Sequence, residues 1–158
     1  MTSSPKRRAK AGGPPAKRPA FVLGDQFGRE LESSTYDGAP LIVVAGNREG
    51  AGGVALWTAA LRAVIGDDGG VDVLPVADLR GVPRLVRKLV GRLLPRDPAH
   101  WCALDWDGQL GALVRGEHGP LVAASYDGAG MLRTWSVLPL ETVESALMVR
   151  LVESASGG

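Results

Sequence analysis

A chain of 158 residues, 45% hydrophobic and 22% charged, is long enough to fold as one domain around a normal core. Its formal net charge of +1 excludes a uniformly basic or acidic protein, and its apolar runs are too short to cross a bilayer. The single cysteine, Cys102, excludes an intramolecular disulfide, a CxxC redox motif and a zinc site built from cysteines.

Residues 1–19 are predicted to form a disordered basic tail. They hold six of the eighteen basic residues and no acid, and they lack the apolar periodicity needed to offset chain entropy. No apolar segment follows these charges, as a signal peptide would require, so we expect a cytoplasmic protein. Residues 20–154 are predicted to be the folded domain, and residues 155–158 a short flexible C-terminus. Residues 20–158 together are mildly acidic, with twelve basic residues against seventeen acids.

The first half of the domain shows strands, a turn and a helix in succession. Residues 21–23 form an apolar run before a turn cluster at 24–28, which predicts a strand entering a hairpin. Residues 40–46 are continuously apolar and β-branched, a pattern typical of a strand buried on both faces. A loop at 47–53 leads into a helix that ends near residue 65. Its apolar stripe consists of Trp57, Leu61, Val64 and Ile65.

The middle of the chain continues this alternation. Residues 71–76 are predicted to be a strand and residues 101–104 a shorter one. Between them, residues 82–94 give the strongest helical pattern, with apolar residues on one side and basic residues on the other. Pro83 suits the first turn of this helix, and Pro95 ends it.

The last third predicts a hairpin and a closing helix. A short helical segment is expected around residues 110–114. Residues 120–125 and 131–137 then form an antiparallel pair of strands. A terminal amphipathic helix follows, with Val143, Ala146, Leu147 and Leu151 on its apolar side. Alternating strands and helices predict an α/β fold with a central mixed, mostly parallel sheet flanked by helices, closed by the hairpin and the last helix.

Four short motifs resemble the redoxin (AhpC/TSA, peroxiredoxin-like) branch of the thioredoxin superfamily. They are the hairpin FVLGDQFG at 21–28, the strand entry DGAPLIVV at 37–44, the LDWDG turn at 104–108, and GPLV at 119–122 with Asp127-Gly128 downstream. The resemblance covers roughly residues 20–153. It implies a thioredoxin-like fold, with the segment at 119–122 corresponding to the one that carries the family's cis-proline.

The chain departs from this family at the position of the catalytic cysteine. In redoxins that cysteine lies after the central strand, where a helix N-terminus stabilises its thiolate. Here the loop at 47–53 contains no cysteine, serine or threonine. Cys102 is expected to lie in a strand as a small buried hydrophobic residue. We therefore expect no catalytic residue, and a non-catalytic domain that binds a partner or a small ligand. The alternative is a divergent peroxiredoxin-like thiol oxidoreductase, an antioxidant that uses Cys102 or an imported redox partner.

The composition of the loop at 47–53 predicts which kind of ligand the loop could bind. Its glycines expose backbone N–H groups at a helix N-terminus and Arg48 adds positive charge, which together suit an anion. In the resembling fold this loop faces the segment at 119–122. The hypothetical site combines Arg48, Glu49, Trp57, His118 and Pro120. The alternative is a loop that serves only as a connector.

Other features support weaker hypotheses. His100 and Cys102 would share a face of a strand, but two donors do not define a metal site, so no metal and no cofactor are expected. The tail suits weak, salt-sensitive contact with nucleic acid. The basic side of residues 82–94 suits nucleic acid or a membrane surface, but solvated basic faces are common, and we expect no membrane contact. A homodimer is compatible with the resemblance, although nothing requires one. Trp106 is expected to be exposed in an interaction surface.

Overall fold

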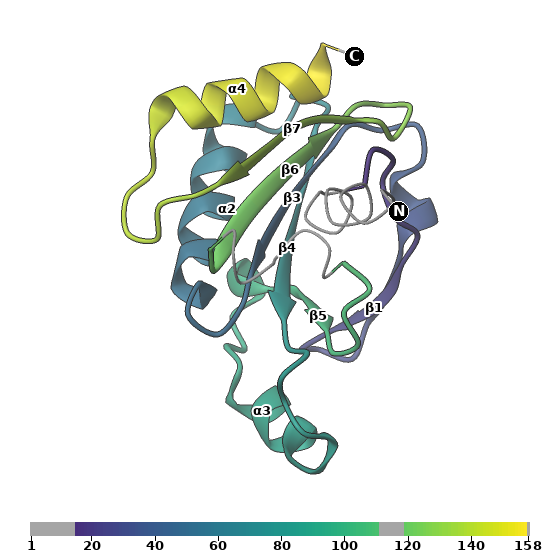
Figure 1. Ribbon diagram of the computed structural model, residues 1–158, viewed down its shortest axis with the longest axis vertical. Helices are drawn as coiled ribbons and strands as arrows, with labels where there is room; N and C mark the ends of the chain where they lie inside the picture. Colours follow the sequence, from purple (N-terminus) through teal and green to yellow (C-terminus); the bar gives the residue numbers. More distant parts are fainter. Residues whose placement is uncertain (1–14, 111–118, 158) are drawn as a thin grey trace, which may run out of the picture.

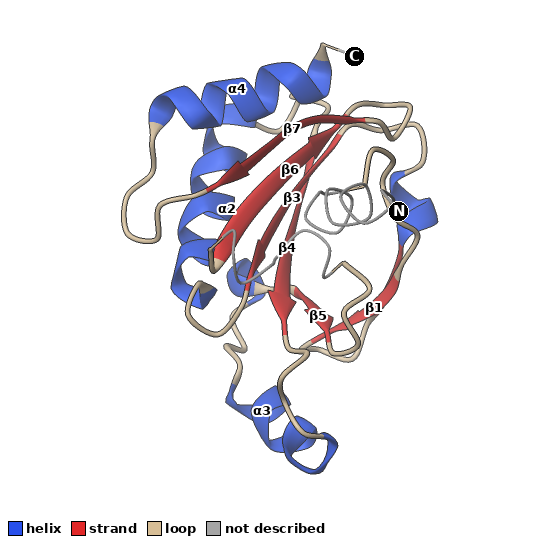
Figure 2. Cartoon of the chain, in the orientation of Figure 1, coloured by secondary structure: helices blue, strands red, loops and turns tan. Residues whose placement is uncertain are grey.

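The computed structural model describes residues 15–110 and 119–157. Within these residues the chain forms seven strands and three α-helices (Figure 2). The strands are β1 (Val22–Asp25), β2 (Glu30–Glu32), β3 (Leu41–Gly46), β4 (Asp72–Asp78), β5 (Ala103–Asp105), β6 (Leu121–Tyr126) and β7 (Leu132–Val137). The helices are α2 (Ala51–Ile65), α3 (Arg87–Leu93) and α4 (Ser145–Ser156). Short 3-10 turns lie at η1 (Ser33–Tyr36), η2 (Arg84–Val86) and η3 (Pro98–His100).

The strands form one mixed sheet in the order β2-β1-β5-β4-β3-β6-β7. The three central strands, β5, β4 and β3, run parallel to one another. The β1–β2 and β6–β7 hairpins pair antiparallel onto the two sides of this core. The structure thus confirms the predicted mixed α/β architecture. The sheet is not mostly parallel as predicted, because only the two central pairings are parallel and the four pairings of the hairpins are antiparallel.

Strand β3 lies at the heart of the core because all six of its residues are buried, as its continuous apolar sequence predicts. Helices α2 and α4 cover one face of the sheet (Figure 1). There Trp57, Leu61 and Leu151 pack against Ile42 and Val44. The opposite face of β3 belongs to a second cluster of buried residues. This cluster includes Phe21, Leu23, Tyr36, Leu74, Leu110 and Tyr126.

Most predicted elements are present, with small shifts at their ends. Helix α2 ends at Ile65 as expected, although Val64 of its predicted stripe is 51% exposed. The strand predicted at 101–104 begins only at Ala103, so Cys102 precedes it and is half-buried rather than fully buried. Ala16 and Arg18, assigned to the tail, hydrogen-bond to Leu132 and Gly130 of the final hairpin. Of the short helical segment expected at 110–114, residues 111–114 lie outside the described part of the chain.

The helix predicted over residues 82–94 is shorter than expected and does not contribute to the core. Its place is taken by η2 followed by the seven-residue α3, and neither contains a buried residue. Figure 1 shows α3 projecting away from the sheet. The apolar periodicity was therefore a correct signal for a helix but a wrong one for burial. Within the described residues, no helix is both long and apolar enough to span a membrane.

Candidate functional site

The side chain of Asn47 closes the loop between β3 and α2. Oδ1 of Asn47 accepts hydrogen bonds from the backbone N–H groups of Glu49 at 2.9 Å and Gly50 at 3.2 Å. The N–H of Asn47 in turn donates to the carbonyl oxygen of Pro120 at 3.0 Å. The loop and the segment before β6 therefore lie against each other. The N–H groups of Glu49 and Gly50, which could otherwise bind an anion, are therefore already hydrogen-bonded within the turn.

Close packing at Gly50 fixes this arrangement. A Cβ atom added at Gly50 would lie 2.3 Å from the carbonyl oxygen of Pro120, so only glycine fits without movement of the backbone. The resemblance placed a cis-proline in this segment. That expectation is wrong for Pro120, because no cis peptide bond occurs among the described residues.

The residues predicted for a ligand site do not all meet. Arg48 and Glu49 are exposed beside Pro120, which is half-buried. Trp57 is fully buried between α2 and the sheet, and its indole N–H donates to the carbonyl oxygen of Pro139 at 2.9 Å. Trp57 is thus a core residue, which its place in the helical stripe also predicts. His118 lies outside the described residues.

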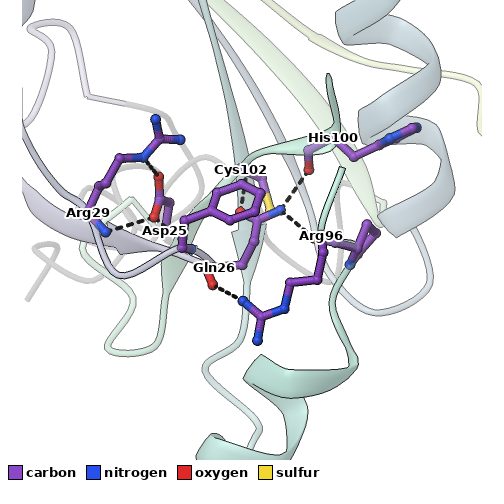
Figure 3. Close-up of polar contacts among 8 residues, drawn as sticks. Asp25, Gln26, Arg29, Arg96, His100 and Cys102 are labelled. Carbon is purple, nitrogen blue, oxygen red and sulfur yellow. Dashed lines mark hydrogen bonds and ion pairs between the residues drawn. The ribbon is translucent and has the colours of Figure 1, made fainter. Parts of the chain in front are cut away.

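The sole cysteine occupies a different place, held by Gln26 in the turn after β1 (Figure 3). The N–H of Cys102 donates to Oε1 of Gln26 at 3.0 Å. Nε2 of Gln26 donates to the carbonyl oxygens of His100 at 2.8 Å and Pro95 at 3.3 Å. Arg96 completes the cluster by donating to the backbone oxygen of Gln26 at 2.7 Å. This network fixes the backbone around Cys102, and no motif in the sequence singled out Gln26.

The environment of Cys102 opposes ionisation of its thiol. Burial raises the pKa of Cys102 to about 11, and the negative charge of Asp25 contributes in the same direction. Asp25 carries that charge because its carboxylate accepts hydrogen bonds from Arg29 and from the backbone N–H of Phe27. These contacts hold the pKa of Asp25 below its ordinary value although burial acts to raise it. At neutral pH the thiol is therefore protonated and poorly nucleophilic.

The pairing of His100 with Cys102 on one strand is also not observed. His100 ends the turn η3, and its Nδ1 lies 3.5 Å from a carboxylate oxygen of Asp97. Cys102 lies between this turn and β5. In the described part of the chain, no three His, Cys, Asp or Glu side chains are grouped as metal ligands would be.

Trp106 is half-buried rather than fully exposed. The guanidinium carbon of Arg87 lies 5.3 Å from the centre of its ring, so α3 covers one face of the indole. The same side chain donates to the backbone oxygen of Trp106 at 3.3 Å. Trp106 therefore anchors α3 to the domain.

A depression of about 380 Å³ lies at the end of α2, away from the loop at 47–50. Arg62 lies over the ring of Trp101, with its guanidinium carbon 5.6 Å from the ring centre. Burial lowers the pKa of Arg62. The lining is Tyr36, Arg62, Ile65, Gly66, Asp67, Val71, Asp72, Val73 and Trp101. Sequence patterns gave no sign of this grouping, because its residues come from four separate segments.

No protein-family model and no curated protein matches this sequence. Solved structures do match. A thiol:disulfide interchange protein of the thioredoxin family from Chlorobium tepidum is 14% identical, with a TM-score of 0.56 over 89% of this chain and 96% of its own. The pneumococcal exposed lipoprotein thioredoxin Etrx1 from Streptococcus pneumoniae is 16% identical, with a TM-score of 0.58 over 85% and 98%. A peroxiredoxin-like protein from Aquifex aeolicus is 13% identical, with a TM-score of 0.55 over 90% and 89%.

At these levels of identity the similarity concerns the fold and not the chemistry. All three matches extend over at least 85% of this chain, so the similarity concerns the whole architecture and not a fragment of it. This chain has a thioredoxin-like fold, with one cysteine and no possible intramolecular disulfide.

Proposed function

We propose that this protein is a non-catalytic thioredoxin-fold domain that acts by binding a partner or a small ligand. The main support is the state of its only thiol, because burial and the charge of Asp25 keep Cys102 protonated at neutral pH. The turn at Asn47–Gly50, which follows the central strand, offers no cysteine, serine or threonine. The fold also fits an oxidoreductase that uses Cys102, but no contact from the described residues favours ionisation of that thiol.

Thiol-dependent peroxide consumption tests the non-catalytic part of this proposal. The full chain and its Cys102→Ser variant are compared, with dithiothreitol as reductant and hydrogen peroxide as substrate. Equal rates that do not exceed the protein-free background support the proposal. Turnover by the wild-type chain that disappears with Cys102→Ser would establish a thiol peroxidase instead.

Titration with inorganic phosphate separates the two kinds of binding. Because Asn47 already accepts the N–H groups of Glu49 and Gly50, these groups are not free to bind a small anion. Amide NMR signals of residues 48–50 are then expected to stay unchanged as phosphate is added. Saturable shifts that vanish in Arg48→Ala would instead assign a small-anion site to this loop.

A further inference from the structure

A row of leucines is left exposed on the segment that projects from the sheet. Leu85 in η2 is 97% exposed, and Leu89 and Leu93 in α3 are 56% and 74% exposed. They are spaced four residues apart, which places them along one side of the helical segment. A row of exposed apolar side chains is a surface feature that marks an interaction site.

A basic row runs beside the leucines. Arg84, Lys88 and Arg92 each precede one of the three leucines by one residue, so the two rows are adjacent on the helical surface. All three basic side chains are exposed, and no acid among the described residues forms an ion pair with them. The opposite side of the segment faces the domain, where Arg87 contacts Trp106 and Asp107. The free side is thus half apolar and half cationic.

The positive charge of this surface favours an anionic binding partner. Residues 79–96 contain six basic residues and no acid. Only Arg80, Arg87 and Arg96 among these six contact other parts of the described chain. An acidic surface would therefore be attracted by three cations that form no ion pair with other described residues.

The leucines decide which kind of anionic surface fits. A nucleic acid would use the cations, but its phosphates give leucine side chains nothing to contact. A protein groove would need a shape that matches a convex, projecting element (Figure 1). A lipid surface needs no such match, because its acyl chains are fluid and its headgroups supply the negative charge.

We infer that this projecting segment, η2 with α3, is a peripheral docking element for anionic lipid membranes. Leu85, Leu89 and Leu93 enter the boundary between headgroups and acyl chains, and Arg84, Lys88 and Arg92 contact the lipid phosphates. The segment lies on the bilayer and does not span it. This inference goes beyond the proposed function and does not depend on it. It differs from the sequence-based expectation of no membrane contact, because the exposure of the leucines could not be seen in the sequence.

Co-sedimentation with vesicles tests this inference with the full chain. Vesicles of mixed phosphatidylglycerol and phosphatidylcholine are compared with vesicles of phosphatidylcholine alone. The protein is expected to sediment with the anionic vesicles and to remain in solution with the neutral ones. Binding to neither kind, or equal binding to both, would overturn the inference.

Two triple variants measure the contributions of the leucine row and the basic row to vesicle binding, and both keep the basic tail unchanged. The triple change Leu85→Ser, Leu89→Ser and Leu93→Ser keeps every cation, and it is expected to weaken binding to anionic vesicles about tenfold or more. The change Arg84→Gln, Lys88→Gln and Arg92→Gln is expected to do the same through lost charge. Because all six side chains are exposed, circular dichroism should show an unchanged fold.

A matched control removes exposed apolar residues elsewhere. Val64 and Val149 are 51% and 45% exposed on α2 and α4, and changing both to serine should leave vesicle binding unaltered. Undiminished binding by the leucine variant would mean that charge alone, including that of the tail, attracts the protein. That result would overturn the assignment of α3 as the docking element.

Discussion

The backbone N–H of Cys102 donates a 3.0 Å hydrogen bond to Oε1 of Gln26, a residue 76 positions earlier in the chain. Through the same side chain, the turn after β1 is joined to the backbone of Pro95 and His100. One buried amide therefore ties three segments together, among them the backbone of the only cysteine. Gln26 is only 7% exposed, so its hydrogen bonds are made away from water.

Replacing Gln26 with alanine should destabilise the fold strongly. The change leaves the N–H of Cys102 and the carbonyl oxygen of His100 without partners, and we expect a loss of about 2–4 kcal/mol in the free energy of unfolding. Gln109 offers a matched control, since its amide makes two 2.8 Å bonds to the backbone of Val22 but is exposed. Gln109→Ala should cost less than about 1 kcal/mol, because water replaces both partners. Urea unfolding of both variants measures the difference, and equal losses would contradict it.

Alkaline pH should destabilise the protein through Cys102. The thiol ionises near its ordinary pKa of 9.0 in the unfolded chain but only near about 11 in the folded one. Between these values the unfolded state releases a proton that the folded state retains, so stability is full below pH 9 and falls as pH rises toward 11. A pKa difference of two units corresponds to a loss of about 2–3 kcal/mol in the free energy of unfolding.

The Cys102→Ala variant isolates this contribution. It removes the thiol but leaves Tyr126, whose pKa burial raises to about 12 and which adds its own loss above its ordinary pKa of 10.0. Unfolding free energies measured from pH 7.5 to pH 10.5 should therefore fall more steeply for the wild-type chain than for Cys102→Ala. Parallel curves would show that the thiol is not buried in the way described.

Two glycines near the start of α2 should respond to alanine in opposite directions. A Cβ at Gly50 meets the carbonyl oxygen of Pro120 at 2.3 Å, so Gly50→Ala should destabilise the fold by about 2 kcal/mol or more. Nothing lies within 4 Å of a Cβ at Gly52, and alanine is the better helix former there. Gly52→Ala should stabilise the protein by about 0.5–1 kcal/mol. Thermal unfolding of the two variants provides the comparison, and a shift of the same sign in both would refute it.

Trp57 should matter for stability and not for ligand contact. Trp57→Phe removes the donor to the carbonyl oxygen of Pro139 and part of a fully buried ring, which should cost about 2 kcal/mol. Arg48→Ala, on the exposed loop, should be neutral within about 0.5 kcal/mol. Guanidinium unfolding of both variants checks the assignment. If Trp57→Phe left the free energy of unfolding unchanged, Trp57 would again be a candidate site residue.

The sequence predicted most of the fold where local patterns and burial agree. The apolar run of β3, the turn residues between β6 and β7 and the stripe of α2 each carry a period that belongs to one kind of element. Burial is a tertiary property, however, and α3 shows the limit of periodicity. Its leucines have helical spacing, but the segment extends beyond the ends of β4 and β5, and Leu85, Leu89 and Leu93 stay exposed there.

The candidate site was less predictable because it depends on contacts between distant segments. The meeting of the loop at 47–50 with Pro120 followed from the resemblance, whereas the trans bond at Pro120 did not. Cys102 was expected inside a strand, but it precedes β5 and its backbone N–H donates to Oε1 of Gln26. A glutamine in a turn cluster carries no local signal for such a role, since only the folded chain brings it to Cys102.

The pH dependence of alkylation of Cys102 by iodoacetamide in the native protein tests whether its thiol is unreactive. The rate reports the thiolate fraction, and the chain unfolded in urea provides the reference for an unperturbed thiol. We expect very slow alkylation at neutral pH and a rise in rate governed by a pKa of about 11 in the folded state. A native rate that already levels off near neutral pH would reveal a reactive thiolate and contradict the non-catalytic assignment.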